Sequence, residues 1–260
     1  AAIFIIFGIK ERKEYSKDPE QAPPFFKSIK LTFKNKAFKR YVLVNFAQWF
    51  IFGLIPIVNP YFLEHIIGID TFQTFFLAII FVSAIIFMIF WKKLFSKNGA
   101  KIGHMIALGS MILTLIPILF ISEIIGAIIT YVLMGFGFAG IMFGRDVVMS
   151  AIIDYDEMDS GIRREGAYYG VNALIIRLST VAVALSVAIV FPTIGWRTYD
   201  PSTVTDITRL GIRILMCLFP AAAIGIALLL FKGFPIDKEK YAEIKVKLEE
   251  IHSEKMKKIV

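Results

Sequence analysis

The sequence predicts an all-α protein that crosses a membrane several times. Six apolar windows cover about 20 residues or more each, and they are 41–66, 72–91, 102–121, 124–144, 168–192 and 207–231. A helix of about 20 residues spans a hydrocarbon core of about 30 Å. Of the 260 residues, 57% are apolar and 19% are charged, whereas soluble domains carry about 25% charge. Because lipid offers the backbone no hydrogen-bond partner, each window should be a helix, and the windows are too long and uniformly apolar for barrel strands.

The composition excludes other classes of protein. Disordered chains are poor in apolar residues, so disorder does not fit. The net charge of +8 might suggest nucleic acid, but the basic residues lie between the apolar windows instead of forming a soluble basic face, which points to a membrane surface. We therefore expect no nucleic-acid partner. Cys217 is the only cysteine, so an intrachain disulfide is impossible and no thiol-metal site is implied.

The segment before the first window predicts a linker instead of a folded domain. Residues 1–7 are apolar and precede a charged stretch, which is the reverse of a secretory signal and indicates the end of another transmembrane helix of a larger protein. Residues 8–40 contain Pro19, Pro23 and Pro24 and predict a linker with a basic, surface-lying helix.

The distribution of Lys and Arg predicts how the chain crosses the membrane. Residues 8–40 hold 10 of them, 92–101 hold four, 150–167 hold two and 232–260 hold eight, whereas 193–206 hold one and 67–71 and 122–123 hold none. By the positive-inside rule, the first four segments are cytoplasmic. Residues 41–231 then form a six-helix bundle with both ends on the cytoplasmic side of the cell membrane.

The tail, residues 232–260, predicts a cytoplasmic amphipathic helix. Its apolar residues recur at three- and four-residue spacing, at Tyr241, Ile244, Leu248 and Ile251, and Asp237 is placed to cap the helix start. We expect this helix to pack on the cytoplasmic ends of the bundle or on lipid headgroups. Binding of a partner protein is the alternative.

Arg177 is the only charged side chain deep inside any of the six windows. Nine residues of about 1.5 Å each separate it from Tyr168, which places it about 13.5 Å deep, near the middle of the hydrocarbon core. A charge there costs at least about 2.5–3.5 kcal/mol and usually faces a polar interior. We expect Arg177 to serve a substrate or coupling-ion site. The alternative is a structural arginine paired with a carboxylate of a neighbouring helix.

Two polar stripes extend this candidate site. Tyr169, Asn172 and Thr180 share helical spacing with Arg177, and Asn45 and Gln48 lie on a second stripe with Trp49 beside it. Amides exchange hydrogen bonds with hydroxyl groups, and an aromatic plane can pack on the C–H face of a sugar ring. Ordinary hydrogen bonding between helices is an equally good explanation for Asn45, Gln48 and Trp49.

Four glycines of the fourth window predict close helix packing. Gly135, Gly137, Gly140 and Gly144 include a G-x-x-x-G pair, and small residues let helices approach closely. A sliding surface for a moving helix is the alternative.

The segment after that window is the most highly charged loop that we predict. Its charged candidates, which we assign to a cytoplasmic gate, are Arg145, Asp146, Asp154, Asp156, Glu157, Asp159, Arg163, Arg164 and Glu165. A calcium loop would need glycine at its sixth position, where Asp159 stands, so we expect no metal site. The residues instead predict ion pairs that form in one state of a protein and break in another.

No catalytic residues are expected. A lipid-phosphate enzyme with a carboxylate-held magnesium ion would need a second acidic cluster on the cytoplasmic side, which the sequence does not show.

The string D-Y-D-E-M-D-S-G-I-R-R-E-G-A-Y-Y-G, residues 154–170, resembles the signature of the glycoside–pentoside–hexuronide:cation symporters, the melibiose-permease-like branch of the major facilitator superfamily. The resemblance covers essentially the whole chain, and it implies the C-terminal half of a twelve-helix transporter. Residues 1–7 would then be the end of the sixth transmembrane helix, and residues 8–40 the cytoplasmic central loop. Members of this family use a sodium or proton gradient to drive uptake of a sugar or related solute by alternating access. The implied partners are a small solute, the lipid bilayer and the N-terminal six-helix half.

The resemblance also implies roles for two residues. Arg177 stands where melibiose permease has a lysine near the cation and sugar sites, and Asn172 stands at a glutamine position near the sugar. Arginine stays charged under ordinary conditions, which puts a role that needs deprotonation in doubt. The coupling-cation ligands of the family lie in the first half, so we expect no cofactor and no metal ligand here. The alternatives are a lysophospholipid symporter of the same family and a membrane scaffold without a transport cycle.

Overall fold

A computed structural model describes residues 25–71, 73–195 and 203–259, and every regular element within these ranges is a helix. The all-α prediction is confirmed. The predicted end of a preceding helix at residues 1–7 and the prolines of the 8–40 segment lie outside the described residues. Arg197, which supplied the one positive charge on the predicted outer side, also lies outside them.

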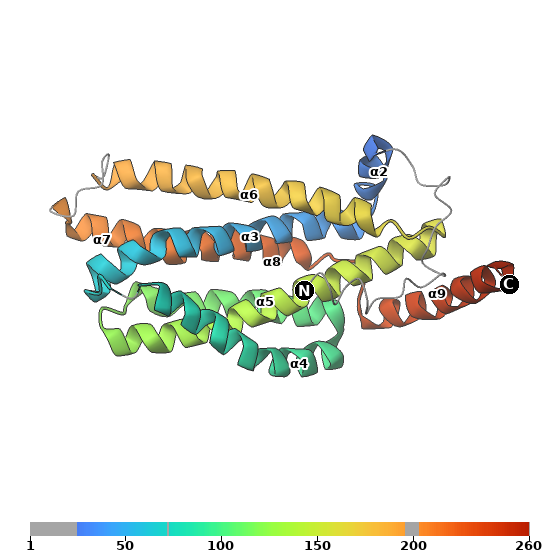
Figure 1. The fold of residues 1–260 in the computed structure, drawn as a ribbon, viewed down its shortest axis with the longest axis horizontal. Coiled ribbons are helices and arrows are strands. Elements are labelled where there is room, and N and C mark those ends of the chain that lie inside the picture. The colour runs from blue at the N-terminus through green and yellow to red at the C-terminus, as the bar shows by residue number, and fades with distance from the viewer. Residues whose placement is uncertain (1–24, 72, 196–202, 260) are drawn as a thin grey trace, which may run out of the picture.

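The helices lie mostly side by side along one long axis (Figure 1). They are α2 (Phe25–Thr32), α3 (Lys36–Phe62), α4 (Gln73–Leu115), α5 (Ile124–Ser160), α6 (Glu165–Thr193), α7 (Asp206–Arg213), α8 (Phe219–Phe231) and α9 (Lys238–Ile259). Single π-helical turns at Leu63–Ile67 and Ile214–Leu218 and a 3₁₀ turn at Ile116–Leu119 extend three of them. Five of the described helices are long and apolar enough to cross a membrane.

Helix α4 contains two of the six predicted windows, 72–91 and 102–121. Gly99 lies between them with φ 77° and ψ 177°, a left-handed backbone that breaks the helix into two arms. Contacts with α5 give the arms opposite directions. Ser83 and Trp91 of the first arm contact α5 at Gly135 and Gly140, in that order. Figure 1 shows the turn between the two arms of α4.

In the second arm the order is reversed. His104 meets Gly144, and Met111, seven residues further on, meets Gly137. The two arms therefore run antiparallel along α5, and the two windows correspond to two separate passes.

The glycines of α5 make this close approach possible. A Cβ atom placed on Gly140 would lie 2.5 Å from the Trp91 ring, and one on Gly137 would lie 2.8 Å from the Cα atom of Met111. No side chain fits at those separations. The prediction of close packing is confirmed. The Trp91 ring is also held against α5 by a hydrogen bond, which its Nε1 donates to the carbonyl of Phe136 at 2.8 Å.

Two predicted boundaries are corrected by the structure. Helix α3 begins at Lys36, five residues before the predicted window, because the Asn35 side chain accepts hydrogen bonds from the backbone of Ala37 and Phe38 and caps the helix. Helix α5 continues to Ser160, so Asp154, Asp156, Glu157 and Asp159 lie on a helix and not in a loop. The connection to α6 is only residues 161–164, and Gly161 with φ 67° ends α5.

Four segments predicted to be cytoplasmic meet at one end of the bundle. Figure 1 places α2, the turn of α4, the α5–α6 connection and α9 at the same end, and α7 at the other. Helix α9 packs on α5, with Ile244 and Leu248 buried, and Asp237 caps it by accepting from the backbone of Lys240 at 2.8 Å. The tail helix thus packs on the bundle, which is one of the two placements that we expected for it.

Candidate functional site

The amides predicted for a solute site bond between helices inside the bundle. Asn45 Nδ2 donates to Asn172 Oδ1 and joins α3 to α6. Gln48 Nε2 lies 2.7 Å from His104 Nε2 and joins α3 to α4. Asn45 and Gln48 are fully buried, and Asn172 is 8% exposed. Among the described residues, these three side chains therefore form bonds between helices, as the alternative explanation for the α3 stripe expects, and their role in a solute site stays a prediction.

The Gln48–His104 pair leaves polar atoms without partners. Gln48 Oε1, His104 Nδ1 and Trp49 Nε1 are buried and bond to nothing among the described residues. A buried polar atom without a partner costs about 1–3 kcal/mol. Sequence reasoning missed His104, although a histidine inside an apolar window was a usable signal.

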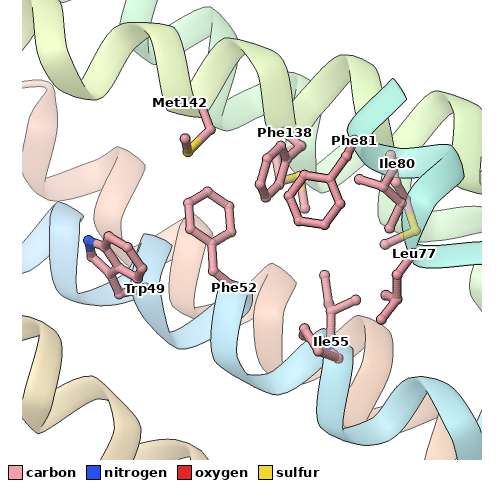
Figure 2. Close-up of a pocket in the computed structure, with 11 residues that line it drawn as sticks. Trp49, Phe52, Ile55, Leu77, Ile80, Phe81, Phe138 and Met142 are labelled. Carbon is pink, nitrogen blue, oxygen red and sulfur yellow. The ribbon is translucent and has the colours of Figure 1, made fainter. Parts of the chain in front are cut away.

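Trp49 lies beside an apolar cavity between α3, α4 and α5. The cavity has a volume of about 300 Å³, and its eleven lining residues include four aromatic side chains from three helices, Trp49, Phe52, Phe81 and Phe138. Figure 2 shows the Phe52 and Phe138 rings next to each other, and their centroids lie 4.5 Å apart, so the two rings are in contact. The lining side chains offer aromatic faces, alkyl groups and thioethers, so this cavity suits an apolar group.

Arg177, Tyr169 and Thr180 lie on an exposed face of α6. Arg177 is the thirteenth of the 29 residues of the helix, near its middle. Its guanidinium has no hydrogen bond or ion pair with any residue that the structure describes, and Tyr169 is 46% exposed. Asn172 points into the bundle instead, so the structure separates it from the other three residues. The alternative for Arg177, pairing with a carboxylate of a neighbouring helix, does not occur among the described residues.

The charged residues at the other candidate site form a compact cluster. Arg163 Nη1 lies 3.0 Å from Asp154 Oδ1 and 3.0 Å from Glu157 Oε2, and its Nε lies 3.2 Å from Glu165 Oε2. Arg164 makes two hydrogen bonds to Asp156. Paired bonds between guanidinium and carboxylate fix the orientation of both groups. The short connection between α5 and α6 is therefore held to the last turns of α5.

Helix α9 supplies further partners to this cluster. His252 Nε2 lies 3.0 Å and Lys255 Nζ lies 3.3 Å from Glu157 Oε1, and Tyr241 donates to Asp154 at 3.0 Å. The Glu157 side chain is fully buried and contacts three basic side chains. Sequence reasoning missed His252 and Lys255, although they continue the helical spacing of Tyr241 and Leu248.

The cluster holds its residues in defined charge states. Burial alone would lower the pKa of Arg163, but hydrogen bonds to Glu157 and Asp154 and their charges raise this pKa above its ordinary value. Burial, followed by the charge of Asp154, raises the pKa of Tyr241 to about 12. Near neutral pH, Arg163 is therefore a cation and Tyr241 a hydrogen-bond donor.

Three predicted gate residues lie outside this cluster. Arg145 pairs with Asp146 at 3.4 Å and places its Cζ atom 5.2 Å from the centre of the Trp49 ring, a cation–π contact. Asp159 is exposed and forms no ion pair with any residue that the structure describes. The predicted gate thus divides into a cluster around Arg163 and a separate contact between α5 and α3.

Comparison with known proteins identifies the class to which this helical chain belongs. A family model described as "MFS/sugar transport protein" matches residues 1–238. The chain therefore belongs to the MFS/sugar transport protein family.

Three relatives support this assignment. The chain is 24% identical over 259 residues to "Sodium-dependent lysophosphatidylcholine symporter 1" of Gallus gallus, which covers 97% of this chain and 48% of the relative. It is 26% identical over 230 residues to "Uncharacterized symporter YjmB" of Bacillus subtilis (strain 168), covering 86% of this chain and 49% of the relative. It is also 26% identical over 172 residues to "Uncharacterized symporter sll1374" of Synechocystis sp., covering 64% of this chain and 31% of the relative. The chain spans about half the length of these relatives, or less.

Proposed function

We propose that this chain acts as the C-terminal half of a secondary active transporter that couples uptake of a sugar or related polar solute to a sodium or proton gradient by alternating access. The observation that carries the proposal is Arg177, a cation near the middle of an apolar helix with no partner among the described residues. A charge at that depth is costly unless another polar group meets it. Such a group would come from a solute or from the N-terminal half.

The geometry supports two separate roles within the chain, contact with the solute or the opposite half and closure of the cytoplasmic end. The exposed face of α6 with Arg177, Tyr169 and Thr180 contacts the solute or the opposite half. The cluster around Arg163 closes the cytoplasmic end in one state and opens in the other, because its ion pairs join α5, α6 and α9 at that end.

Uptake by sealed vesicles tests the proposal. The vesicles contain this chain together with the N-terminal half that the proposal requires, and labelled glycosides are offered with a sodium gradient, with a proton gradient and with neither. We expect uptake with at least one gradient. Vesicles that hold this chain alone are the control, and we expect no uptake in them. Uptake that ignores both gradients, or full activity of the chain alone, would contradict the proposal, and no uptake with either gradient would favour a membrane scaffold.

Replacing Arg177 tests its role within the same assay. We expect Arg177→Ala to reduce gradient-driven uptake at least tenfold, because the only charge in the middle of α6 is lost. The matched control is Arg209→Ala, which removes an exposed cation that pairs with Asp206 near the start of α7. Equal uptake by the Arg177 variant and the unaltered protein would assign Arg177 a structural role.

The apolar cavity favours a second candidate, the lysophospholipid symporter considered above. A space of about 300 Å³ lined by Phe52, Phe81, Phe138 and methionines suits an alkyl chain better than a sugar. Under this candidate, Phe138→Asn should lower uptake of a labelled lysophospholipid and leave glycoside uptake unchanged. Uptake of glycosides but not of lysophospholipids by the unaltered protein would rule it out.

A further inference from the structure

The first arm of α4 carries three lysines in one hollow. The hollow has a volume of about 590 Å³ and is lined by Ile89, Lys92, Lys93, Ser96 and Lys97. Each of these residues lies three or four positions from at least one of the others, so together they form one broad face of the helix. All three lysine side chains are exposed, and none forms an ion pair with any residue that the structure describes. Three like charges within two turns repel one another unless an anion lies among them.

The surface that leads into the hollow is apolar and exposed. Ile85 is 69% exposed, Ile86 66% and Ile89 67%, and they lie on the turns immediately before Lys92. The exposed surface therefore changes from branched alkyl groups to ammonium groups within one helical turn. A phospholipid shows a matching order of groups along its length, because apolar acyl chains lie in the membrane core and the charged phosphate lies at the interface.

A fourth cation lies at the edge of this surface. Lys238, the first residue of α9, donates from Nζ to the backbone carbonyl of Lys97 at 2.9 Å and packs against Gly99. No acidic side chain lines the hollow. Each lysine near an anionic membrane surface contributes about 1 kcal/mol, a factor of about five in affinity.

We propose that Lys92, Lys93 and Lys97 bind the phosphate of an anionic phospholipid whose acyl chains lie along Ile85, Ile86 and Ile89. The lipid covers the apolar face and at the same time places a negative charge among the lysines, which neither free phosphate nor a solvated surface does. This site is separate from the solute site and does not depend on the proposed transport activity.

Native mass spectrometry of the full chain in detergent tests the site. The protein is mixed with phosphatidylglycerol or phosphatidylcholine, and bound lipid is measured for the unaltered protein and for a variant that combines Lys92→Gln, Lys93→Gln and Lys97→Gln. We expect the unaltered protein to prefer phosphatidylglycerol, and the triple variant to bind it at least tenfold more weakly. Inorganic phosphate at equal concentration should not displace the lipid.

A matched variant separates a site from a general effect of charge. Lys34→Gln, Lys36→Gln and Lys39→Gln together remove the same charge from exposed lysines at the same end of the bundle. We expect this variant to bind phosphatidylglycerol as the unaltered protein does, and Lys→Arg replacements at 92, 93 and 97 to retain binding. Equal loss in both glutamine variants, or no loss in either, would overturn the proposal. Circular dichroism checks that each variant is folded.

Photocrosslinking identifies what covers the face. A benzophenone amino acid in place of Ile89, in the assembled transporter in phosphatidylglycerol-containing vesicles, should crosslink to lipid. Crosslinking to a protein segment instead would overturn the proposal, since the apolar face would then belong to a protein interface.

Discussion

Buried amides of α3 connect it to three neighbouring helices. Asn45 reaches α6, Gln48 reaches the second arm of α4, and Asn59 accepts a hydrogen bond from Tyr131 of α5. Directional bonds of this kind fix which residues face each other, which apolar contacts alone do not do. The Gln48–His104 pair differs from the other two, because Gln48 and His104 each keep one buried polar atom without a hydrogen-bond partner among the described residues.

The Gln48–His104 bond predicts that the effects on stability of replacing its two residues are not additive. Replacing either Gln48 or His104 by leucine leaves its partner buried without a hydrogen bond, and we expect each change to destabilise the protein by about 1–3 kcal/mol. The double variant removes both polar groups and should cost clearly less than the sum. Unfolding in mixed detergent measures all three variants. Additive effects would show that the bond does not stabilise the bundle.

Helix α5 is the element against which both arms of α4 pack. Its glycines are spaced so that side chains of opposite arms alternate along it, with Ser83 and Trp91 from one arm and Met111 and His104 from the other. In the membrane, where apolar burial gives helices no net advantage over lipid, this close packing is a main source of stability.

The packing predicts different responses of two glycines to the same change. Gly140→Ala would place a methyl group 2.5 Å from the Trp91 ring, and we expect a loss of about 1–3 kcal/mol of stability. Gly109→Ala meets no atom within 4 Å, and its higher helix propensity should stabilise α4 by up to about 1 kcal/mol. Thermal unfolding of both variants checks the difference. Equal midpoints would refute the packing argument.

The docking of α9 depends on one buried carboxylate. We expect Glu157→Gln to weaken the contacts with His252 and Lys255 and to cost about 1–3 kcal/mol, because hydrogen bonds to charged groups are worth more than neutral ones. Amide hydrogen exchange in residues 238–259 should become at least tenfold faster. Glu249→Gln, an exposed change on α9 itself, is the control. Unchanged exchange in the Glu157 variant would mean that α9 is held by its apolar face alone.

Ion pairs at one end of the whole molecule control its conformation under the proposed function. Arg164→Asp would place two carboxylates together at Asp156, and this end of the bundle should open. A cysteine at position 180, in a Cys217→Ala background, should then react several-fold faster with an alkylating reagent added from that side. Adding Asp156→Arg should restore the slower rate.

The matched control for that experiment is Arg209→Asp, which alters an exposed ion pair near the start of α7, at the other end of the bundle. We expect it to leave the alkylation rate from the α9 end unchanged. If all of these variants react at the same rate, the cluster is structural and does not act as a gate.

The sequence was sufficient for the helical class and for the position of each apolar window, because uninterrupted apolar runs leave the backbone one way to satisfy its hydrogen bonds. It was not sufficient for the charged stretch after the fourth window. Asp154, Asp156 and Glu157 looked like a loop, since charged residues are unusual in transmembrane helices. Their pairing with Arg163, Arg164 and α9 instead lets the helix continue to Ser160.

Candidate residues were harder to place than helices. Helical periodicity predicts Asn172 and Arg177 on one face of α6. In the structure, Asn172 is bonded to Asn45 of α3, whereas Arg177 remains exposed. Helical spacing shows which residues share a face of the helix, but it does not show which neighbouring helix buries which part of that face. The contacts of Glu157 with His252 and Lys255 join residues 95 and 98 positions apart, a separation that no local pattern reveals.

That separation also sets an order of events during synthesis. Glu157 emerges from the ribosome long before the two α9 side chains that meet it, so its carboxylate must stay hydrated, or rely on Arg163 alone, while the remaining helices are inserted. The contact can form only after residue 255 has been made. Docking of α9 therefore reports that every helix from α5 onward has been synthesised, and the exposed Glu157 of an unfinished chain would mark that chain as incomplete.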